Sequence, residues 1–394
     1  MRCLSILSGA LLSLILTACT SDPLASAGRE TPPPPPPAVS QAPAPTARPT
    51  PAPPPPLVGA AMPRPAASDA SGELYPLWFG TNRKPELSGT VLRTYGTERD
   101  NAVHLGKVFV EIPRDYLQHL RGDSWLKKTW FKTDERGLLV RQPVPMDGTT
   151  FLADLQSELK PQLPNERVLL VYIHGFQTSF TEAAQRSASI GYQLKMPVTA
   201  FYSWPSKGAV AGYEADRNAA EASVDHLARF LIQMVRESGA TKVHLIAHSM
   251  GNFALLQAMQ RPLMQDALRT GLRFGQVILA APDVDADVFT RDATVYARYA
   301  DRVTLYASSK DLALKASSKL ASLQRAGGLP PVTVVKGIDT LDVSEVNLTL
   351  LGHSYVADEL TVLEDMHTLI SSGQAPAKRY RVRPVAAGDY WQLR

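Results

Sequence analysis

Cysteine is almost absent from this 394-residue sequence. The two cysteines, Cys3 and Cys19, both lie within the first twenty residues, so a disulfide framework for the rest of the chain is excluded. The excess of positive charge is also small, with a formal net charge of +4. No basic block alternates with aromatic residues along the chain, and the one basic run, KRYRVR at 378–383, is interpreted as a solvated tail. Nucleic-acid binding is therefore not expected.

The apolar stretch LSGALLSLILTAC, residues 7–19, is too short to span a bilayer. It follows Arg2 and has the form of a signal-peptide core. The LTAC sequence that ends it resembles a bacterial lipobox, which predicts a signal peptide at 1–18 and lipidation of Cys19. No aspartate directly follows Cys19, and this favours the outer membrane, facing the periplasm. The alternative is a plain secretory signal with a chance cysteine.

Proline dominates residues 31–56, which read TPPPPPPAVSQAPAPTARPTPAPPPP. Such a run has too few backbone donors and too little apolar surface to build a core, and it favours an extended polyproline conformation. At about 3.1 Å per residue it would reach up to roughly 80 Å from a lipid anchor. Residues 19–73 are therefore predicted to be a lipidated cysteine followed by a disordered linker.

Regular structure is expected from about residue 74. The stretches LYPLWFGTNR (74–83) and HLGKVFVEIPR (104–114) have the composition of strands, and in the second Val108, Val110 and Ile112 alternate onto one face. Residues 74–160 are interpreted as an N-terminal strand-containing subdomain, and 161–394 as the catalytic domain.

Beyond residue 161, short apolar runs alternate with helical stretches. This alternation predicts an α/β fold with a mostly parallel central sheet and helices on both faces. The carboxyl ends of such strands are where active sites lie. The expected strands are 167–176, 198–206, 242–249, 276–285, 302–311 and 331–339. The expected helices are 178–194, 213–237, 250–260, 286–299, 312–326 and 355–371.

A serine stands at the junction of the expected strand 242–249 and the expected helix 250–260, in the sequence AHSMG, residues 247–251. This matches the nucleophile-elbow pattern G-x-S-x-G with Ala247 in the first glycine position. Small residues are needed there because the strand and the next helix pack closely at the turn. Ser249 is therefore predicted to be a nucleophile, and the alternative is a serine that only caps a helix.

A serine hydroxyl needs a base to take its proton. In this architecture the partners follow the serine in the order acid, then histidine. Only His353 and His367 follow Ser249; His353, in the loop-like LLGHSY, is favoured over His367, which falls within a predicted helix. For the acid, Asp311 at the end of a predicted strand is favoured, and Asp283 remains the alternative.

The tetrahedral intermediate of such a reaction needs backbone N–H donors. One is expected from Met250, directly after the nucleophile. The other is expected from Phe176 in the HGF sequence that ends the 167–176 strand. Trp204, at another strand end, either lines an acyl pocket with Phe176 or closes the core, and the sequence does not decide between the two.

No metal site is expected. His244 and His248 are four residues apart, but on a strand that spacing spans roughly 13 Å, too far for one shared ion. The chemistry predicted from the serine also requires no cofactor.

The chain carries, in this order, the motifs FGTNRKP, YGTERDN, GKVFVEIPR, VYIHGF, YSWPS, ADRNAAEAS, LIAHSMGN, LAAPDVD, SSKDLALK and GHSY. With these motifs it resembles the DUF900 family of bacterial alpha/beta hydrolases. The resemblance implies the alpha/beta-hydrolase fold and the triad Ser249, Asp311 and His353. Asp216 and Arg217 belong to a shared motif to which no chemistry is assigned, and a helix cap is expected of Asp216.

These features predict a membrane-anchored serine hydrolase that cleaves a small-molecule or lipid ester through an acyl-enzyme on Ser249. An amidase, a peptidase or an acyltransferase would use the same triad. The alternative from another class is a catalytically silent envelope lipoprotein that uses the fold to bind a partner.

Overall fold

The computed structural model describes residues 72–114, 137–208, 212–346, 360–386 and 388–394, all of which belong to one compact unit. The predicted signal peptide, Cys19, the proline-rich linker and His353 lie outside the described residues.

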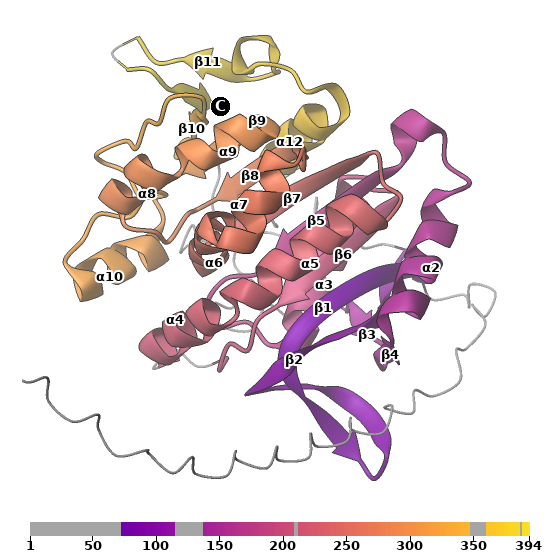
Figure 1. Ribbon diagram of the computed structural model, residues 1–394. Coiled ribbons are helices and arrows are strands. Elements are labelled where there is room, and N and C mark those ends of the chain that lie inside the picture. Colours follow the sequence, from indigo (N-terminus) through magenta and orange to yellow (C-terminus); the bar gives the residue numbers. More distant parts are fainter. Residues whose placement is uncertain (1–71, 115–136, 209–211, 347–359, 387) are drawn as a thin grey trace, which may run out of the picture. The chain divides into compact units, whose positions relative to one another are not determined.

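A single mixed sheet forms the centre of the described chain (Figure 1). Its strands run in the order β11-β12-β10-β9-β8-β7-β5-β6-β1-β2-β3, and β4 also pairs with β2. The seven pairings from β12 through β10, β9, β8, β7, β5 and β6 to β1 are parallel. The strands are β1 (Gly72–Ser88), β2 (Val91–Pro113), β3 (Leu139–Val140), β4 (Val144–Met146), β5 (Val168–Ile173), β6 (Val198–Ser203), β7 (Lys242–His248), β8 (Phe274–Ala280), β9 (Ala300–Ala307), β10 (Asp339–Asp342), β11 (Val382–Pro384) and β12 (Trp391–Leu393).

Helices cover both faces of this sheet. One face packs against α2, α4, α5, α6, α7, α8 and α9, and the other against α3, α10 and α12. The predicted fold class, a mostly parallel sheet covered on both faces and preceded by N-terminal strands, is confirmed. The helices are α2 (Gly148–Leu159), α3 (Phe180–Gln193), α4 (Tyr213–Ala222), α5 (Val224–Glu237), α6 (Met250–Gln260), α7 (Pro262–Arg269), α8 (Ala286–Asp292), α9 (Thr294–Tyr299), α10 (Leu312–Ala321) and α12 (Leu360–Ser372).

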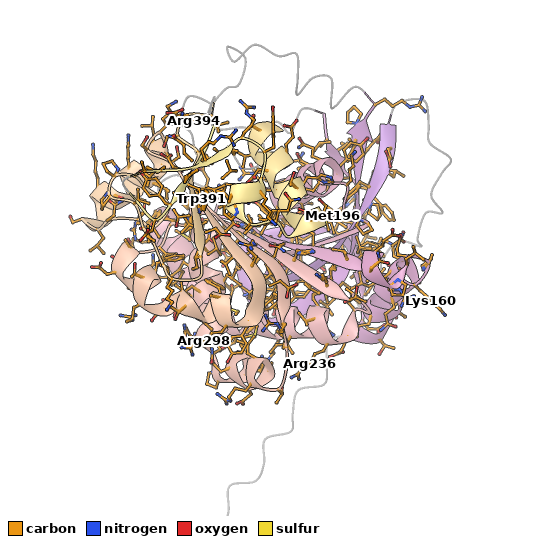
Figure 2. The ribbon with its side chains drawn as sticks, turned by 90° about the horizontal axis from the view of Figure 1, so that it is seen from above. Lys160, Met196, Arg236, Arg298, Trp391 and Arg394 are labelled. Atoms are coloured by element: carbon orange, nitrogen blue, oxygen red, sulfur yellow. The ribbon has the colours of Figure 1, made fainter. Side chains whose placement is uncertain are left out.

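The N-terminal strands are part of the same sheet. β1 lies between β2, to which it is antiparallel, and β6, to which it is parallel. The two apolar faces of β1 are buried in different layers, with Trp78 on the side of α2 and Phe79 on the side of α3. Figure 2 shows Lys160, at the end of α2, and Trp391 of β12 far apart across the sheet. Because β1 has a hydrogen-bonded neighbour on each side, it is an interior strand of the sheet.

The register of the parallel strands brings four loops together. Ile173 at the end of β5 pairs with Ala247 of β7, His248 pairs with Ala280 of β8, and Ala280 pairs in turn with Tyr306 of β9. Because parallel strands end at the same edge of a sheet, the loops after these strands meet there.

Three details differ from the sequence-based expectation. Residues 331–338 do not form a strand, and β10 begins only at Asp339; Pro330 and Pro331 lack the N–H groups that a strand requires. The helix expected at 213–237 is divided at Ser223 into α4 and α5, and the helix expected at 286–299 is divided at Ala293. The helices α2 and α7 were not expected. Among the described residues, no helix is long and apolar enough to cross a membrane.

Candidate active site

Ser249 occupies a sharp turn between a strand and a helix. β7 ends at His248 and α6 begins at Met250, while Ser249 between them has φ +52° and ψ −123°. A non-glycine residue pays a conformational cost there, and such strain recurs at catalytic turns. Ser249 is also 2% exposed. This is the geometry of a nucleophile elbow.

The small residue after the serine is required by close packing. A Cβ built on Gly251 would lie 2.5 Å from the carbonyl oxygen of His174 and 2.7 Å from that of Ile173. A larger residue there would push the start of α6 away from the end of β5. Ala247, in the first glycine position of the motif, is fully buried.

Backbone hydrogen bonds hold the elbow to the neighbouring strand. The N–H of Ser249 donates to the carbonyl of Ala280 at 3.0 Å, and the N–H of Asp283 donates to the carbonyl of Ser249 at 3.2 Å. The buried amide of Asn252 donates to the carbonyls of Ala247 (2.9 Å) and Ala280 (3.1 Å). The turn is therefore supported from β8 and from its own helix.

The loop after β5 lies directly against the elbow. A Cβ on Gly175 would come within 3.0 Å of the carbonyl oxygen of His248. Phe176 follows, half-buried, with its ring edge-on to Tyr213 at a centroid distance of 5.4 Å. Met250 is the first residue of α6, and the first N–H groups of a helix have no partner within it. The two N–H groups predicted as oxyanion donors thus belong to adjoining segments.

The carboxylate of Asp216 fixes this loop from the side of α4. It accepts hydrogen bonds from the N–H of Gln177 (3.0 Å), the N–H of Lys207 (2.6 Å) and the hydroxyl of Ser206 (2.5 Å). The expectation that Asp216 caps its own helix is wrong, because its acceptor sites are used by the two loops. Its neighbour Arg217 packs over the ring of Phe253 at 3.8 Å.

A second charged group, Arg83 of β1, lies under the same loops and is fully buried. Its guanidinium donates to the carbonyls of Thr178 (2.7 Å), Gly96 (2.9 Å) and Ser206 (3.2 Å) and to the hydroxyl of Ser203 (2.8 Å). The sequence placed Arg83 in the FGTNRKP motif without a role. No pattern in one sequence relates a strand residue to loops a hundred positions away.

His174 and Trp204 pack on each other in the core beside the loop. Their rings are stacked at 4.7 Å, and the indole N–H donates to the carbonyl of His174 at 2.9 Å. Trp204 is fully buried, so of the two roles left open for it, the structure supports closing the core. Burial, assisted by the positive charge of Arg83, holds the pKa of His174 well below its usual value. The ring is therefore neutral.

The two candidate acids have different surroundings. Asp311 is 1% exposed, follows β9 and caps α10 by accepting from the N–H of Leu314 at 2.9 Å. Asp283 accepts hydrogen bonds from the hydroxyls of Tyr213 (2.9 Å) and Ser317 (2.7 Å) and pairs with the buried guanidinium of Arg325. Asp283 is thus the centre of a polar cluster. Desolvation, and after it the negative charge of Asp283, raises the pKa of the half-buried Tyr213 hydroxyl.

The histidines can be placed only in part. His353, the predicted base, lies outside the described residues. His367 lies in α12, and its Nδ1 is 3.0 Å from the carbonyl of Leu194 at the end of α3. His244 accepts the N–H of Gln276 at Nδ1. Within the described ranges, no three His, Cys, Asp or Glu side chains are grouped as a metal site would need.

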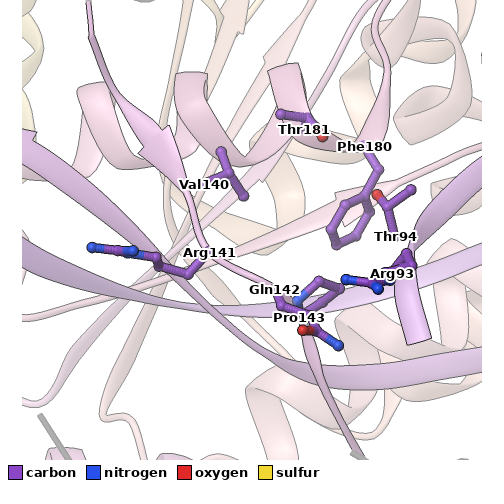
Figure 3. A pocket seen from close by; sticks show the side chains of 8 residues that line it. All are labelled: Arg93, Thr94, Val140, Arg141, Gln142, Pro143, Phe180 and Thr181. Carbon is purple, nitrogen blue, oxygen red and sulfur yellow. The ribbon is translucent and has the colours of Figure 1, made fainter. Parts of the chain in front are cut away.

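A cavity of about 200 Å³ lies away from the elbow, beside the start of α3. In Figure 3 the guanidinium of Arg141 extends away from Arg93, and Arg141 pairs instead with Glu111 at 2.5 Å. The two positive groups therefore do not converge on one ligand. The cavity is lined by Arg93, Thr94, Val140, Arg141, Gln142, Pro143, Phe180 and Thr181.

The sheet and the serine elbow at its carboxyl edge define an alpha/beta hydrolase. The model of the family described as "Alpha/beta hydrolase of unknown function (DUF900)" matches residues 151–372, more than half of the chain. The chain belongs to this family, and the resemblance noted from the sequence is confirmed. A search of curated proteins found no match.

Several solved structures are distantly similar. Aspergillus fumigatus lipase B is 10% identical with a TM-score of 0.34, over 52% of this chain and 53% of that one. An uncharacterized Bacillus cereus protein is 13% identical with a TM-score of 0.35, over 54% and 62%. Carboxylesterase CesB from Bacillus subtilis is 13% identical with a TM-score of 0.27, over 53% and 85%. The chain thus spans about half to three fifths of the first two, and likenesses this distant carry no argument about its substrate.

Proposed function

We propose that this alpha/beta hydrolase is a serine hydrolase that cleaves carboxylic esters through an acyl-enzyme on Ser249. The observation that carries the proposal is the strained elbow at Ser249, buried against the Gly175–Phe176 loop. A φ of +52° costs conformational free energy in a residue other than glycine. A nucleophile elbow has this conformation because it presents the hydroxyl to the substrate.

In the proposed reaction, His353 takes the proton of the Ser249 hydroxyl as the oxygen attacks the ester carbonyl. The oxyanion that forms is stabilised by the N–H groups of Met250 and Phe176. His353 then returns the proton to the leaving alcohol. Water, activated by the same imidazole, attacks the acyl group and releases the acid.

Asp311 is the acid that we assign to His353. It is buried in the segment that follows the carboxyl end of β9, and β9 is two strands from β7, which leads into the serine. Asp283 is engaged by Tyr213, Ser317 and Arg325, which leaves it poorly suited to orient an imidazole as well. Phe176 and Tyr213 beside the elbow favour an apolar acyl group.

We further propose that the protein is attached to the outer membrane through lipidated Cys19, with the proline-rich segment as a spacer. A small ester or a lipid ester would then be the substrate. The basis is the LTAC sequence and the proline content alone.

Labelling with a fluorophosphonate probe tests the proposed activity. Wild type should be labelled and Ser249→Ala should not. Ser187→Ala is the matched control, because Ser187 is a buried serine of α3 that donates only to the carbonyl of Ala183 among the described residues, and it should be labelled normally. Folded wild type that stays unlabelled and turns over no ester would support the silent, partner-binding lipoprotein instead. Faster turnover of anilides than of matched esters would indicate an amidase.

A further inference from the structure

Arg83 reaches the catalytic loops from a strand outside the family segment, 151–372. Among the described residues, it bonds to the loops around Ser249 and not to Ser249 itself. Its guanidinium uses Nη2 for the carbonyl of Thr178 and Nε for the hydroxyl of Ser203, with distances of 2.7 and 2.8 Å. Five donors in a rigid fork make several such contacts at once, which a lysine cannot do.

The guanidinium is charged at neutral pH despite its burial. Removal from water lowers the pKa of Arg83 to about 9, and the negative charge of Asp216 opposes that shift. A fixed positive charge therefore lies next to the Nε2 side of His174, where the Arg83 Nη2 atom is 3.5 Å away.

This charge selects one tautomer of His174. The Nδ1 atom lies 2.8 Å from the carbonyl oxygen of Gly175, which has no hydrogen to offer, so a bond there requires a proton on Nδ1. Nε2 then carries the lone pair and accepts from the hydroxyl of Ser203 at 3.2 Å, while that hydroxyl accepts from Arg83. The carbonyl of Trp204 lies 3.1 Å from Nε2 and also accepts the N–H of Ser206. The shorter contact at Nδ1, together with the Ser203 hydroxyl and the Arg83 charge beside Nε2, favours the Nδ1–H form over a proton on Nε2.

The carbonyl of Gly175 and the N–H of Phe176 belong to the same peptide unit. In a planar trans peptide these two groups point in opposite directions, so fixing one fixes the other. We propose that Arg83 is a positioning residue: through Ser203 and His174 it orients the Gly175–Phe176 peptide and so aims the Phe176 N–H at the oxyanion.

The next peptide of the loop is fixed by the partner charge. The N–H of Gln177 donates to Asp216 at 3.0 Å, and the carbonyl of Phe176 accepts from the hydroxyl of Thr178 at 3.1 Å. Gln177 itself has φ +54°. Arg83 and Asp216 thus hold successive peptides of the loop, and the loop needs no rearrangement when charge develops on the substrate.

The inference rests on the proposed function, since it assigns a role within the same reaction. Two variants test it. Arg83→Lys keeps the charge and loses the fork; Ser203→Ala keeps the arginine and removes the link to His174. In both, we expect kcat for an ester to fall at least about tenfold with KM within about twofold, because a misdirected oxyanion donor affects the transition state. The inhibition constant of a trifluoromethyl ketone, which forms a tetrahedral oxyanion on the serine, should rise by the same factor.

The matched control is Arg379→Lys. Arg379 is equally buried but bonds to Asp365 of α12 rather than to the loop after β5. This variant controls for the cost of disturbing any buried arginine, and its kcat and inhibition constant should stay near those of wild type. If Arg83→Lys does not fold, Ser203→Ala decides by the same measurements. Values within twofold of wild type in the folded variants, or a change confined to KM, would overturn the inference.

A spectrum of histidine ring nitrogens separates this inference from the activity. Long-range ¹⁵N–¹H correlation on wild type should show His174 neutral with its proton on Nδ1, and a shift toward the Nε2–H form in Ser203→Ala. A proton on Nε2 in wild type would overturn the role of Arg83 whether or not the protein hydrolyses esters. Absence of fluorophosphonate labelling with the Nδ1–H form present would instead refute the proposed function alone.

Discussion

Asp283 and Arg325 form a buried ion pair, with 3.1 Å between the carboxylate oxygen Oδ1 and Nε and side chains that are 4% and 3% exposed. Breaking such a pair by removing one charge leaves the other uncompensated in the interior, which costs about 3–5 kcal/mol. The two candidate acids can therefore be told apart by replacing each with asparagine. Loss of a carboxylate that only pairs with a buried charge should lower stability, whereas loss of one that orients the catalytic histidine should lower kcat.

We predict that Asp283→Asn lowers the free energy of unfolding by about 3 kcal/mol and changes kcat of the folded protein less than tenfold. Asp311→Asn should lower kcat by about 10³–10⁴, because an amide no longer holds the imidazole in the productive tautomer. Chemical denaturation and ester turnover measured on both variants check this. A large loss of kcat confined to Asp283→Asn would transfer the catalytic role to Asp283.

Gly175→Ala is predicted to lower kcat/KM at least about a hundredfold, since a displacement of about 1 Å at a reacting centre has that effect. A Cβ at this position would lie 2.8 Å from the Cβ of Ser249. Gly148→Ala is the control, because nothing lies within 4 Å of a Cβ at Gly148. Steady-state kinetics together with a melting curve would distinguish lost activity from lost folding. Unchanged kinetics in Gly175→Ala would show that the loop and the serine are not functionally coupled.

The stability of the protein should fall as the pH is lowered from 6.5 toward 4, in part through His244. Burial lowers the pKa of His244 to about 4, and its Nδ1 accepts the N–H of Gln276. The unfolded chain takes up this proton near pH 6.5 and the folded chain only near 4, so acid favours unfolding in this window by up to about 3 kcal/mol.

His244→Asn keeps an acceptor and removes the titration. The difference in Tm between pH 7.5 and 4.5 should be smaller in this variant than in wild type. An identical difference in the two proteins would mean that His244 is protonated in the fold.

Asp365→Asn is predicted to destabilise the protein by about 3 kcal/mol, because it leaves Arg379 buried without a carboxylate. Arg379 donates through Nη1 to Asp365, and Nε and Nη2 find no partner among the described residues. Adding Arg379→Met should recover at least half of the lost stability. The amide oxygen of the asparagine that replaces Asp365 can still accept from the Tyr306 hydroxyl, and no buried charge remains. Urea unfolding of the single and double variants measures this. A double variant no more stable than the single one would contradict it.

Cys19→Ala is predicted to move the protein from the membrane fraction to the soluble fraction of the envelope. Stable anchoring needs more than one acyl chain, and a lipidated N-terminal cysteine would supply them. Fractionation and metabolic labelling with a fatty acid check the prediction, with Cys3→Ala as the control. Label on Cys3→Ala and none on Cys19→Ala is expected, and equal membrane retention of both variants would argue against the anchor.

The sequence was sufficient for the parts of the site that are local. The elbow at Ser249 follows from a short apolar run, small residues on both sides and a helix, all within about ten positions. The mostly parallel sheet with helices on both faces follows from the alternation of apolar runs and helices. The strand expected at 331–339 was wrong for an equally local reason. Pro330 and Pro331 lack the N–H groups for strand pairing at the start of an apolar run that otherwise favours a strand.

What the sequence did not predict depends on contacts across long separations. From the sequence Asp216 was expected to cap a helix, and only the fold brings it to Gln177 and Lys207. Arg83 precedes the loop that it holds by about ninety residues. Buried charges that bind backbone carbonyls leave no periodic signal, because their partners carry no distinctive side chain.

The interior position of β1 sets the limits of what can be removed from this protein. A chain shortened to residues 151–372 would lose β1, whose residues Trp78–Thr81 pair with Ala200–Ser203 of β6. Without β1, β6 would be an apolar edge strand with unpaired backbone groups, and such edges promote pairing between molecules and precipitation. The carboxylate of Asp216 would also remain without the nearby positive charge of Arg83. A soluble fragment of this protein therefore has to extend beyond residues 151–372 and include β1.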